Sequence, residues 1–286
     1  MTYRESYAYG CEILEKARIA DARLDARLLL EYVCHTTQHD LILNGSRPLS
    51  EEQQTEYEAL IAKRSQRIPL QHITGEQEFM GFTFQVNEYV LIPRQDTEIL
   101  VEEALNMLKP GMKVLDMCTG SGCILLSLLA LAKDCQGIGA DISTEALKVA
   151  QANLVGVSAQ CDRALAARFM ESDLFSQLGQ EQFDVIVSNP PYIASAVIET
   201  LEPEVRLHEP ISALDGTEDG LYFYRKIVTD SKPFLKKDGA LLFEIGHDQG
   251  EAVAELMKAA GFTGVCVKKD YAGLDRVVYG FFEEEA

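Results

Sequence analysis

The sequence predicts an α/β protein in which a mostly parallel sheet follows a small α-helical domain. Three observations predict this architecture. Helical periodicity dominates the chain before residue 67. Short apolar runs then alternate with helical segments beyond residue 112, which is typical of βαβ units. The strand-like segments 265–267 and 276–281 have no helix between them, so they favour an antiparallel hairpin that closes the sheet.

The composition restricts the class of protein. The chain has 286 residues, 47% of them hydrophobic, and a net charge of −19 at pH 7. This charge argues against wide binding to a phosphate backbone, which needs clustered Lys and Arg. Seven cysteines show no CxxC pair, which favours reduced thiols and a cytoplasmic location. No run is apolar enough to span a membrane, no signal peptide opens the chain, and the acidic run 283–285 predicts a solvated tail.

Residues 1–70 are predicted to form the helical domain. One helix presents an apolar face made of Leu24, Leu28, Leu29, Tyr32 and Val33. Ser50 and Gln53 have the spacing of a capping box at the start of another helix. His35 and His39 stand four residues apart, but no further ligands are evident nearby, so no metal site is predicted.

Residues 71–92 are predicted to form a β-hairpin linker. Apolar side chains alternate with polar ones over a short stretch, at Phe82, Phe84 and Val86. A turn at 87–88 is expected to lead into a second strand at 89–92. Pro93 ends this segment, and Asp96 or Thr97 is expected to cap the helix that opens the last domain, residues 93–286.

A stiff loop follows the apolar strand predicted at 183–188. Its residues are Asn189, Pro190, Pro191 and Tyr192. Open α/β sheets bind ligands at the carboxyl ends of their strands, which is where this loop lies. Two prolines fix the backbone and remove two donors, so carbonyl acceptors, one amide and one aromatic ring remain. Such a loop suits the binding of a planar NH2 group. Taken alone, the tetrapeptide could equally be a tight turn that has no chemical role.

A second candidate site is the small-residue turn at 116–122. Its glycines allow a ligand to approach the backbone closely, but neither G-x-G-x-x-G nor a P-loop is present. Asp141 ends the next strand, where an acid accepts hydrogen bonds from ribose hydroxyls. The alternative for Asp141 is a helix cap. A ribose site without a phosphate clamp indicates S-adenosylmethionine as the cofactor.

The two candidate sites together suggest methyl transfer to an amide. Asn189 is expected at the end of the fourth strand, across the switch point from the glycine turn. An amide nitrogen is a poor nucleophile because its lone pair is delocalised. The side-chain oxygen of Asn189 and the carbonyl of Pro190 could hold its two hydrogens, orient it and stabilise its growing positive charge. No strong base is required, since the proton can leave after transfer.

Motifs along most of the chain carry a family resemblance. They are PLQHITG at 69–75, EFMG at 78–81, VLIPR at 90–94, DTE at 96–98, NPPYI at 189–193, EVR at 204–206, EP at 209–210, AL at 213–214, DGL at 219–221, EIG at 244–246, QG at 249–250 and DRVV at 275–278. In these motifs the chain resembles the peptide chain release factor glutamine methyltransferases, the PrmC/HemK family. The tetrapeptide alone is shared with DNA amino-methyltransferases, whereas the other strings are far more specific.

The resemblance implies a seven-stranded, Rossmann-like class I methyltransferase domain behind a helical substrate-recognition domain. It implies cofactor contacts from Cys118, Thr119, Gly120, Ser121, Gly122, Asp141, Leu174 and Asn189. It implies that the glutamine of the Gly-Gly-Gln loop of a class I release factor docks on Asn189, Pro190, Pro191 and Tyr192, with Asn189, Pro190 and Tyr192 as the catalytic residues. Three positions depart from the family pattern, namely Gln95 for Pro, Cys118 for Gly and Leu174 for an aromatic residue.

Two alternatives belong to other classes. An adenine-amino DNA methyltransferase would use the same tetrapeptide, but no basic stripe accompanies the acidic chain. A non-catalytic cofactor-binding scaffold would not need the intact loop at 189–192. The sequence therefore favours a protein-glutamine methyltransferase whose partners are release factors, without direct nucleic acid or membrane binding.

Overall fold

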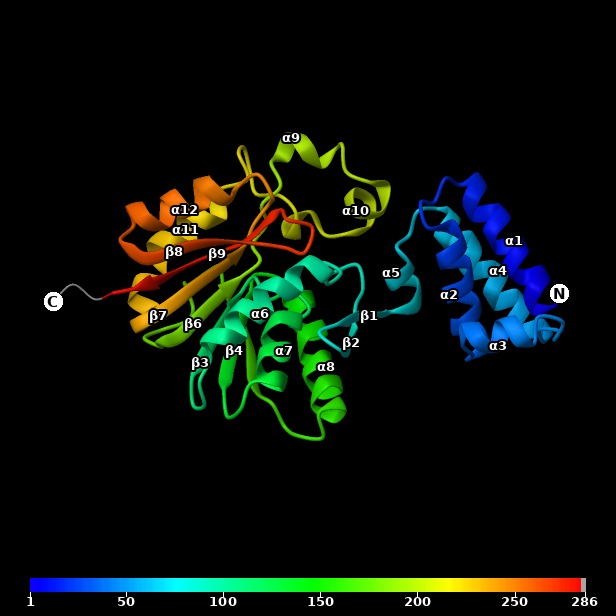
Figure 1. The fold of residues 1–286 in the computed structure, drawn as a ribbon, viewed down its shortest axis with the longest axis horizontal. Helices are drawn as coiled ribbons and strands as arrows, with labels where there is room; N and C mark the ends of the chain where they lie inside the picture. The colour runs from blue at the N-terminus through cyan, green and yellow to red at the C-terminus, as the bar shows by residue number, and fades with distance from the viewer. Residues whose placement is uncertain (284–286) are drawn as a thin grey trace. The chain divides into compact units, whose positions relative to one another are not determined.

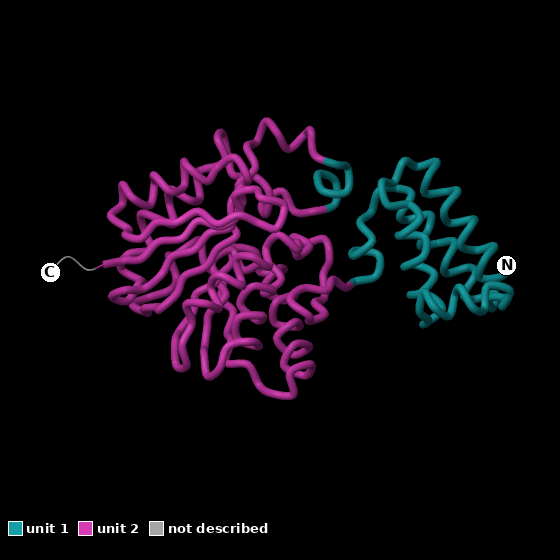
Figure 2. The backbone as a smooth tube through the Cα atoms, viewed as in Figure 1, with its two compact units in different colours: residues 1–75, 202–208 teal, residues 76–201, 209–286 magenta. Residues whose placement is uncertain are grey.

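The structure is a computed structural model that describes residues 1–283. The chain divides into two compact units, shown in different colours in Figure 2. Unit 1 comprises Met1–Gly75 together with Glu202–His208, and unit 2 comprises Glu76–Leu201 with Glu209–Ala286. Among the described residues, no helix combines the length and the apolarity that a membrane span needs. Most of the predicted acidic tail, residues 284–285, lies outside the described residues.

Unit 1 is built from helices around one hydrophobic cluster. They are α1 (Tyr3–Lys16), α2 (Ala22–Cys34), α3 (Gln38–Leu43), α4 (Glu51–Ser65), α5 (Leu70–Thr74) and α10 (Pro203–His208). The capping box predicted at Ser50 is present and begins α4. Leu29 and Val33 of α2 are buried, as predicted. Leu24 and Tyr32 are exposed instead, because the buried stripe follows steps of three and four residues rather than steps of four.

A cluster of ion pairs holds α10 within unit 1. Arg64 of α4 lies with its Nε 2.7 Å from Asp25 Oδ2 and its Nη2 3.0 Å from Glu204 Oε1. Arg67 pairs with Glu202 and Glu204, at 3.0 and 2.9 Å. The side chains of Arg64 and Asp25 are almost fully buried, so solvent screens their pair little, whereas Glu202 is exposed and its pair with Arg67 is screened more. They explain why a segment far along the chain packs with the first helices.

Unit 2 contains a seven-stranded sheet in the order β5-β4-β3-β6-β7-β9-β8 (Figure 1). The strands are β3 (Lys113–Met117), β4 (Gln136–Asp141), β5 (Ala166–Glu171), β6 (Phe183–Ser188), β7 (Leu235–Glu244), β8 (Phe262–Lys269) and β9 (Asp275–Phe282). Each neighbouring pair is parallel except those that include β9. The predicted parallel sheet and its closing antiparallel hairpin are confirmed. The strand order reverses between β3 and β6, which is the switch point.

Helices cover both faces of this sheet. The longer ones are α6 (Glu98–Met107), α7 (Cys123–Leu131), α8 (Thr144–Gln160), α11 (Tyr222–Asp230) and α12 (Gly250–Ala259); the short ones are η1 (Gln95–Thr97), α9 (Ser195–Ile198), η2 (Ile211–Ala213) and η3 (Lys232–Phe234). Val114 and Val185 point to a core shared with α6 and α7, whereas Leu115 and Ile186 point to a core shared with α11 and α12. Strand side chains alternate between faces, so continuous apolar runs fill both cores.

A separate two-stranded hairpin consists of β1 (Glu76–Phe79) and β2 (Phe82–Gln85). A hairpin does lie within the predicted linker, but the predicted turn at 87–88 and second strand at 89–92 are wrong, because β2 pairs with the strand before it. Its turn lies at Met80 and Gly81, which have φ of +51° and +79°, as a two-residue turn of type I′ requires. The chain does turn again near 88, yet residues 89–92 form no strand.

Side-chain amides from α8 complete the outer edge of β2. Asn153 accepts from the backbone N–H of Gln85 at 2.7 Å and donates to its carbonyl at 3.0 Å. Gln160 makes the same two bonds with Thr83, at 2.9 and 3.0 Å. The backbone N–H and C=O groups along this edge of β2 thereby form hydrogen bonds without a further strand. The structure thus groups the hairpin with the sheet of unit 2.

The start of α6 differs from the prediction. Neither Asp96 nor Thr97 caps the helix with its side chain. Thr97 already has helical φ and ψ of −66° and −20°, whereas an N-cap residue has extended backbone. Its hydroxyl lies instead 3.5 Å from the amide nitrogen of Asn189.

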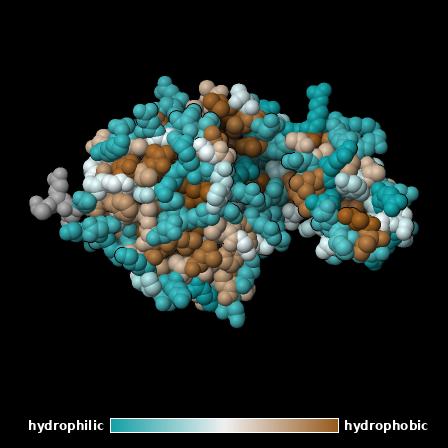
Figure 3. Space-filling view, viewed as in Figure 1, coloured by the Kyte–Doolittle hydropathy of each residue, from teal (hydrophilic) through white to brown (hydrophobic). Residues whose placement is uncertain are grey.

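On the face shown in Figure 3, hydrophilic side chains surround smaller hydrophobic patches in both units.

Candidate active site

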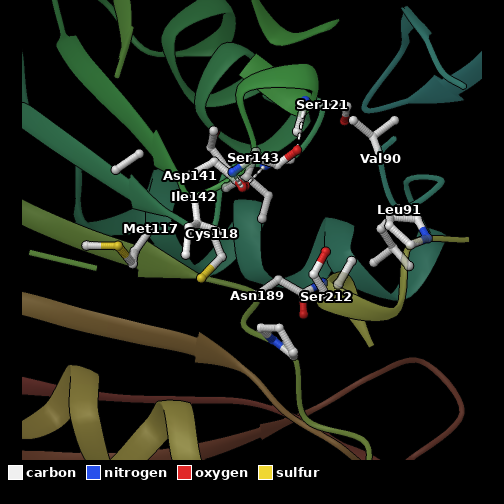
Figure 4. Close-up of a pocket in the computed structure, with 18 of the residues that line it drawn as sticks. Val90, Leu91, Met117, Cys118, Ser121, Asp141, Ile142, Ser143, Asn189 and Ser212 are labelled. Carbon is white, nitrogen blue, oxygen red and sulfur yellow. Dashed lines mark hydrogen bonds between the residues drawn. The ribbon is translucent and has the colours of Figure 1, made fainter. Parts of the chain in front are cut away.

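A cavity of about 500 Å³ lies at the carboxyl ends of β3, β4 and β6 in unit 2 (Figure 4). The predicted site residues on its wall are Cys118, Thr119, Gly120, Ser121, Asp141, Leu174, Asn189 and Pro191. Gly122, Pro190 and Tyr192 were also predicted and are not among its lining residues. The volume is within the range of small-molecule sites. The structure therefore brings the glycine turn, the acid and the loop together at the switch point.

The turn after β3 combines small residues with left-handed backbone. Cys118, Gly120 and Gly122 have φ of +62°, +53° and +77°. A Cβ at Gly122 would lie 3.0 Å from the ring of Phe169 and 3.2 Å from the Cβ of Ala150. Because it has no Cβ, Gly122 allows the start of α7 to pack closely on β5 and α8.

A buried carboxyl group braces this turn from inside. Asp116 Oδ2 accepts from the hydroxyl of Thr119 at 2.6 Å and from the backbone N–H of Leu125 at 3.3 Å. Its Oδ1 has no hydrogen-bond partner among residues 1–283. Burial raises the pKa of Asp116 to about 7, because the charged form is poorly solvated there.

Asp141 connects the turn to the start of α8. Its Oδ2 accepts from the N–H of Gly120 and its Oδ1 from the N–H of Ser143, both at 2.9 Å. Ser143, not Asp141, is the N-cap of α8, and its Oγ accepts from Ala146 N. Burial raises the pKa of Asp141. Two backbone bonds fix the carboxylate on the cavity wall and leave lone pairs free for further donors.

Asn189 lies on the side of the cavity opposite Asp141 and Ser143 (Figure 4). The strand before it is tied to β3, because the Ser188 hydroxyl donates to the Met117 carbonyl at 2.7 Å. The Asn189 Nδ2 donates to the hydroxyl of Thr97, another residue of the cavity wall, in a weak bond of 3.5 Å. The end of β6 therefore holds an amide side chain at the cavity wall.

Contacts behind the loop fix its backbone. Gln249 Nε2 donates to the carbonyl of Tyr192 at 3.0 Å, and its Oε1 accepts from Gly246 N. Gly220 has φ of +73°, and a Cβ there would collide with the backbone carbonyl oxygen of Tyr192. The ring of Tyr192 packs on the apolar core that includes α11 and α12, and burial raises its pKa. The Tyr192 side chain therefore points to the core rather than to the cavity.

The third wall of the cavity consists of residues that no sequence pattern had indicated as site residues. This wall includes Tyr89, Val90, Leu91, Pro93, Arg94, Thr97 and residues 210–213. Arg94 Nη2 lies 2.8 and 2.7 Å from the two carboxylate oxygens of Glu209, which also accepts from Ile92 N. This ion pair joins the two segments. Both lie within motifs of the resemblance, but their apolar residues carry no chemical pattern that marks a site.

The strand order and the site define a class of protein. A seven-stranded sheet with one antiparallel strand and a cavity at the switch point is the fold of S-adenosylmethionine-dependent, class I methyltransferases. A model of the methyltransferase small domain matches residues 95–202, and one of the PrmC N-terminal domain matches residues 5–75. A solved methyltransferase from Pyrococcus furiosus shares this fold, with a TM-score of 0.55 and 16% identity over 78% of this chain and all of that one.

Two relatives define the family. The chain is 41% identical over 282 residues to the release factor glutamine methyltransferase of Caulobacter vibrioides, covering 98% of this chain and 96% of the relative. It is 41% identical over 267 residues to that of Geobacter sulfurreducens, covering 93% and 92%. The chain belongs to the release factor glutamine methyltransferases. The predicted family, fold class and type of enzyme are thereby confirmed.

Proposed function

We propose that this protein transfers a methyl group from S-adenosylmethionine to the side-chain amide nitrogen of the glutamine in the Gly-Gly-Gln loop of class I peptide chain release factors. The observation that carries the proposal is the place of Asn189, which lines the same cavity as the glycine turn and Asp141 and lies across it from Asp141. The names of the Caulobacter and Geobacter relatives support the reaction.

The cavity fits a cofactor that has ribose but no phosphate. Arg94 is the only Lys or Arg among its described lining residues, and it is paired with Glu209. The proposed cofactor contacts are Cys118, Thr119, Gly120, Ser121, Gly122, Asp141, Leu174 and Asn189. S-adenosylmethionine, when bound, supplies a methyl group on a positively charged sulfonium. Asp141 accepts from the ribose hydroxyls, and Leu174 provides an apolar contact.

The loop after β6 receives the substrate amide. Asn189 Oδ1 and the carbonyl of Pro190 accept the two amide hydrogens, which orients the nitrogen and stabilises the positive charge that grows on it. Pro191 and Tyr192 complete the loop, and Gln249 holds its backbone from behind. The proton leaves after transfer, so no strong general base is needed.

The helical domain, residues 1–70, is proposed to recognise the rest of the release factor. The glutamine on the loop of the factor can then enter the site directly, whereas a base in a duplex would first have to be unstacked. The net charge of −19 supports a protein rather than a nucleic acid as the partner. A cytoplasmic location, where release factors act, is part of the proposal.

The test is methylation of a purified release factor by the purified enzyme with labelled S-adenosylmethionine, followed by mass spectrometry of the Gly-Gly-Gln peptide. We expect one methyl group on the glutamine. Asn189→Ala should abolish transfer and leave most of the affinity for the factor, because the helical domain is proposed to bind the rest of the factor. Asn106→Ala is a matched control, since Asn106 is exposed on α6 and outside the cavity.

A change in the factor tests the acceptor. A factor whose glutamine is replaced by glutamate should still bind but should accept no methyl group on nitrogen. Unaltered labelling of that factor, or efficient methylation of duplex DNA by the same preparation, would refute the proposed function.

A further inference from the structure

One buried acid near the site has no role in the mechanism above. Glu244 ends β7, which lies next to β6 in the sheet, and is 2% exposed. Ser188 pairs with Phe243 in the register of these parallel strands, so Asn189 and Glu244 are the next residues along. Glu244 Oε2 has no hydrogen-bond partner among the described residues. A buried acceptor that lacks a donor is costly unless another group uses it.

The groups that face this carboxyl come from several elements. Burial raises the pKa of Glu244 to about 7, and Asp96 adds to the increase. The Thr97 hydroxyl, the Arg276 guanidinium and the Asn189 amide each oppose it by favouring the carboxylate. The other titratable neighbours are Cys123, Tyr192 and Tyr224, the last of which donates to the backbone carbonyl of Glu244. The carboxyl group therefore faces the amide of Asn189 from behind the cavity.

An asparagine amide has two ends of opposite character. The proposed function needs the Oδ1 of Asn189 to face the cavity, because the substrate amide supplies hydrogens and needs acceptors. The Nδ2 must then point away from the substrate amide, toward Thr97 Oγ1, which lies 3.5 Å from it. A carboxylate only accepts hydrogen bonds, so Glu244 favours this orientation as long as it is ionised.

We propose that Glu244 is a positioning residue, whose carboxylate acts with the Thr97 hydroxyl to hold the Nδ2 of Asn189, so that Oδ1 faces the substrate amide. The effect on catalysis rests on the proposed function; the orientation of the amide does not. A protonated Glu244 can donate to Oδ1 instead, so the productive orientation is no longer specified. Methyl transfer should therefore decline as Glu244 becomes protonated.

The first test does not require a measurement of methyl transfer. In protein labelled with 15N-asparagine, the two side-chain N–H signals of Asn189 are identified by their loss in Asn189→Asp. We expect these signals to shift with pH, with a midpoint near pH 7, the pKa of Glu244. The shift should vanish in Glu244→Gln and persist in Glu103→Gln, a control that changes a half-buried glutamate of α6 paired with Lys268. Signals of wild-type Asn189 that do not respond to pH would overturn the proposal without any variant.

The second test is kinetic. Glutamine has nearly the shape of glutamate but can donate as well as accept, so Glu244→Gln should lower kcat by about 10- to 100-fold. KM for the factor should stay within about twofold, because docking is unchanged. The decline of wild-type kcat below pH 7 should disappear in Glu244→Gln and remain in Glu103→Gln. A Glu244→Gln enzyme with wild-type kcat and the same acid decline would overturn the proposal.

The two tests separate the two proposals. A pH response of Asn189 that depends on Glu244, found together with no methylation of the release factor, supports the positioning role and refutes the proposed function. Methylation of the factor without such a response supports the function and overturns the positioning role.

Discussion

At the scale of single residues, two side chains on the cavity wall occupy backbone conformations that favour glycine. Cys118 has φ of +62° and Leu174 has φ of +48°. Such a conformation costs on the order of 1–3 kcal/mol and persists only where neighbouring contacts impose it. At Cys118 these contacts include the bond from Thr119 N to the Ala140 carbonyl, at 3.0 Å. The strain is thus located at the proposed cofactor site.

Cys118 should report cofactor binding. Burial raises the pKa of its thiol, so little thiolate is present at neutral pH and alkylation should be slow. Saturating S-adenosylmethionine should slow it further, by about tenfold or more, if Cys118 lines the bound cofactor. Peptide mapping by mass spectrometry measures the rate, with Cys161, which is outside the cavity, as the internal control. Equal rates at Cys118 with and without cofactor would show that this thiol is only part of the core.

Asp141 should carry much of the affinity for the cofactor. Asp141→Ala should weaken S-adenosylmethionine binding by about 1.5–3 kcal/mol, the range for hydrogen bonds to a charged group. Calorimetry measures the affinity. The control is Ser143→Ala, which removes the cap of α8 but leaves the carboxylate, and which should weaken binding less. Unchanged affinity in a folded Asp141→Ala protein would disprove the ribose contact.

At the scale of elements, the sequence predicted strands better than the turns between them. The alternation at Phe82 and Phe84 correctly indicated β2, because a half-buried strand has a period of two. The turn was misplaced because Met80, a residue uncommon at positive φ, occupies it. The bonds from Asn153 and Gln160 to β2 join positions about 70 residues apart, and no local pattern reveals such contacts.

The edge of β2 gives a paired prediction. Asn153→Ala should lower the free energy of unfolding by about 3 kcal/mol, because it leaves the partly buried backbone groups of Gln85 and the buried carbonyl of Ser121 without partners. Gln160→Ala should cost only about 1 kcal/mol, since water can replace its bonds at an exposed position. Urea unfolding measures both. Equal costs would mean that the edge is not held mainly by the buried amide.

The loop after β6 gives a prediction about close packing. Gly220→Ala should reduce methyl transfer by about 100-fold, because its Cβ would push the Tyr192 carbonyl and displace the loop. Gly179→Ala is the matched control, since Gly179 also has positive φ but no atom lies within 4 Å of its added Cβ. The control should share the backbone strain and retain activity. Loss of activity in both variants would indicate general destabilisation instead.

At the scale of the whole molecule, the order of elements was predictable and the long-range connections were not. Two walls of the cavity follow from residue types at strand ends, namely the glycine turn with Asp141 and the loop at Asn189. The third wall depends on the pair of Arg94 with Glu209, which are 115 positions apart. Burial of Asp116 and Glu244 is likewise a property of the folded cores.

The burial of Asp116 makes the stability of the protein depend on pH. The pKa of Asp116 is about 7 in the folded protein and near 3.8 when unfolded, so the folded state binds the extra proton between these values. The contribution of Asp116 to the free energy of unfolding is fully present below about pH 4 and is lost as the pH rises to 7. Asp116→Asn removes this loss, on the order of 3 kcal/mol. Relative to wild type, the variant should therefore gain stability over this range in urea unfolding without cofactor.

Asp219 provides a control of opposite sign. Its hydrogen bonds with Arg225 lower the pKa of Asp219 to about 2, so its contribution is present above about pH 4 and is lost only as the pH falls toward 2. Asp219→Asn should leave the slope between pH 4 and 7 unchanged. A wild-type slope in Asp116→Asn would show that another group causes the dependence.

The ion pairs of α10 bear on how such proteins can be recombined. The chain crosses the boundary between its units three times, after residues 75, 201 and 208. A gene cut once at 75 would leave Glu202 and Glu204 on one fragment and their partners Arg64 and Arg67 on the other. Residues 1–75 alone therefore do not make up the whole helical unit and should not be exchanged between proteins by themselves. Chimaeras between relatives should inherit both pieces from the same parent, so that the acids and arginines remain matched.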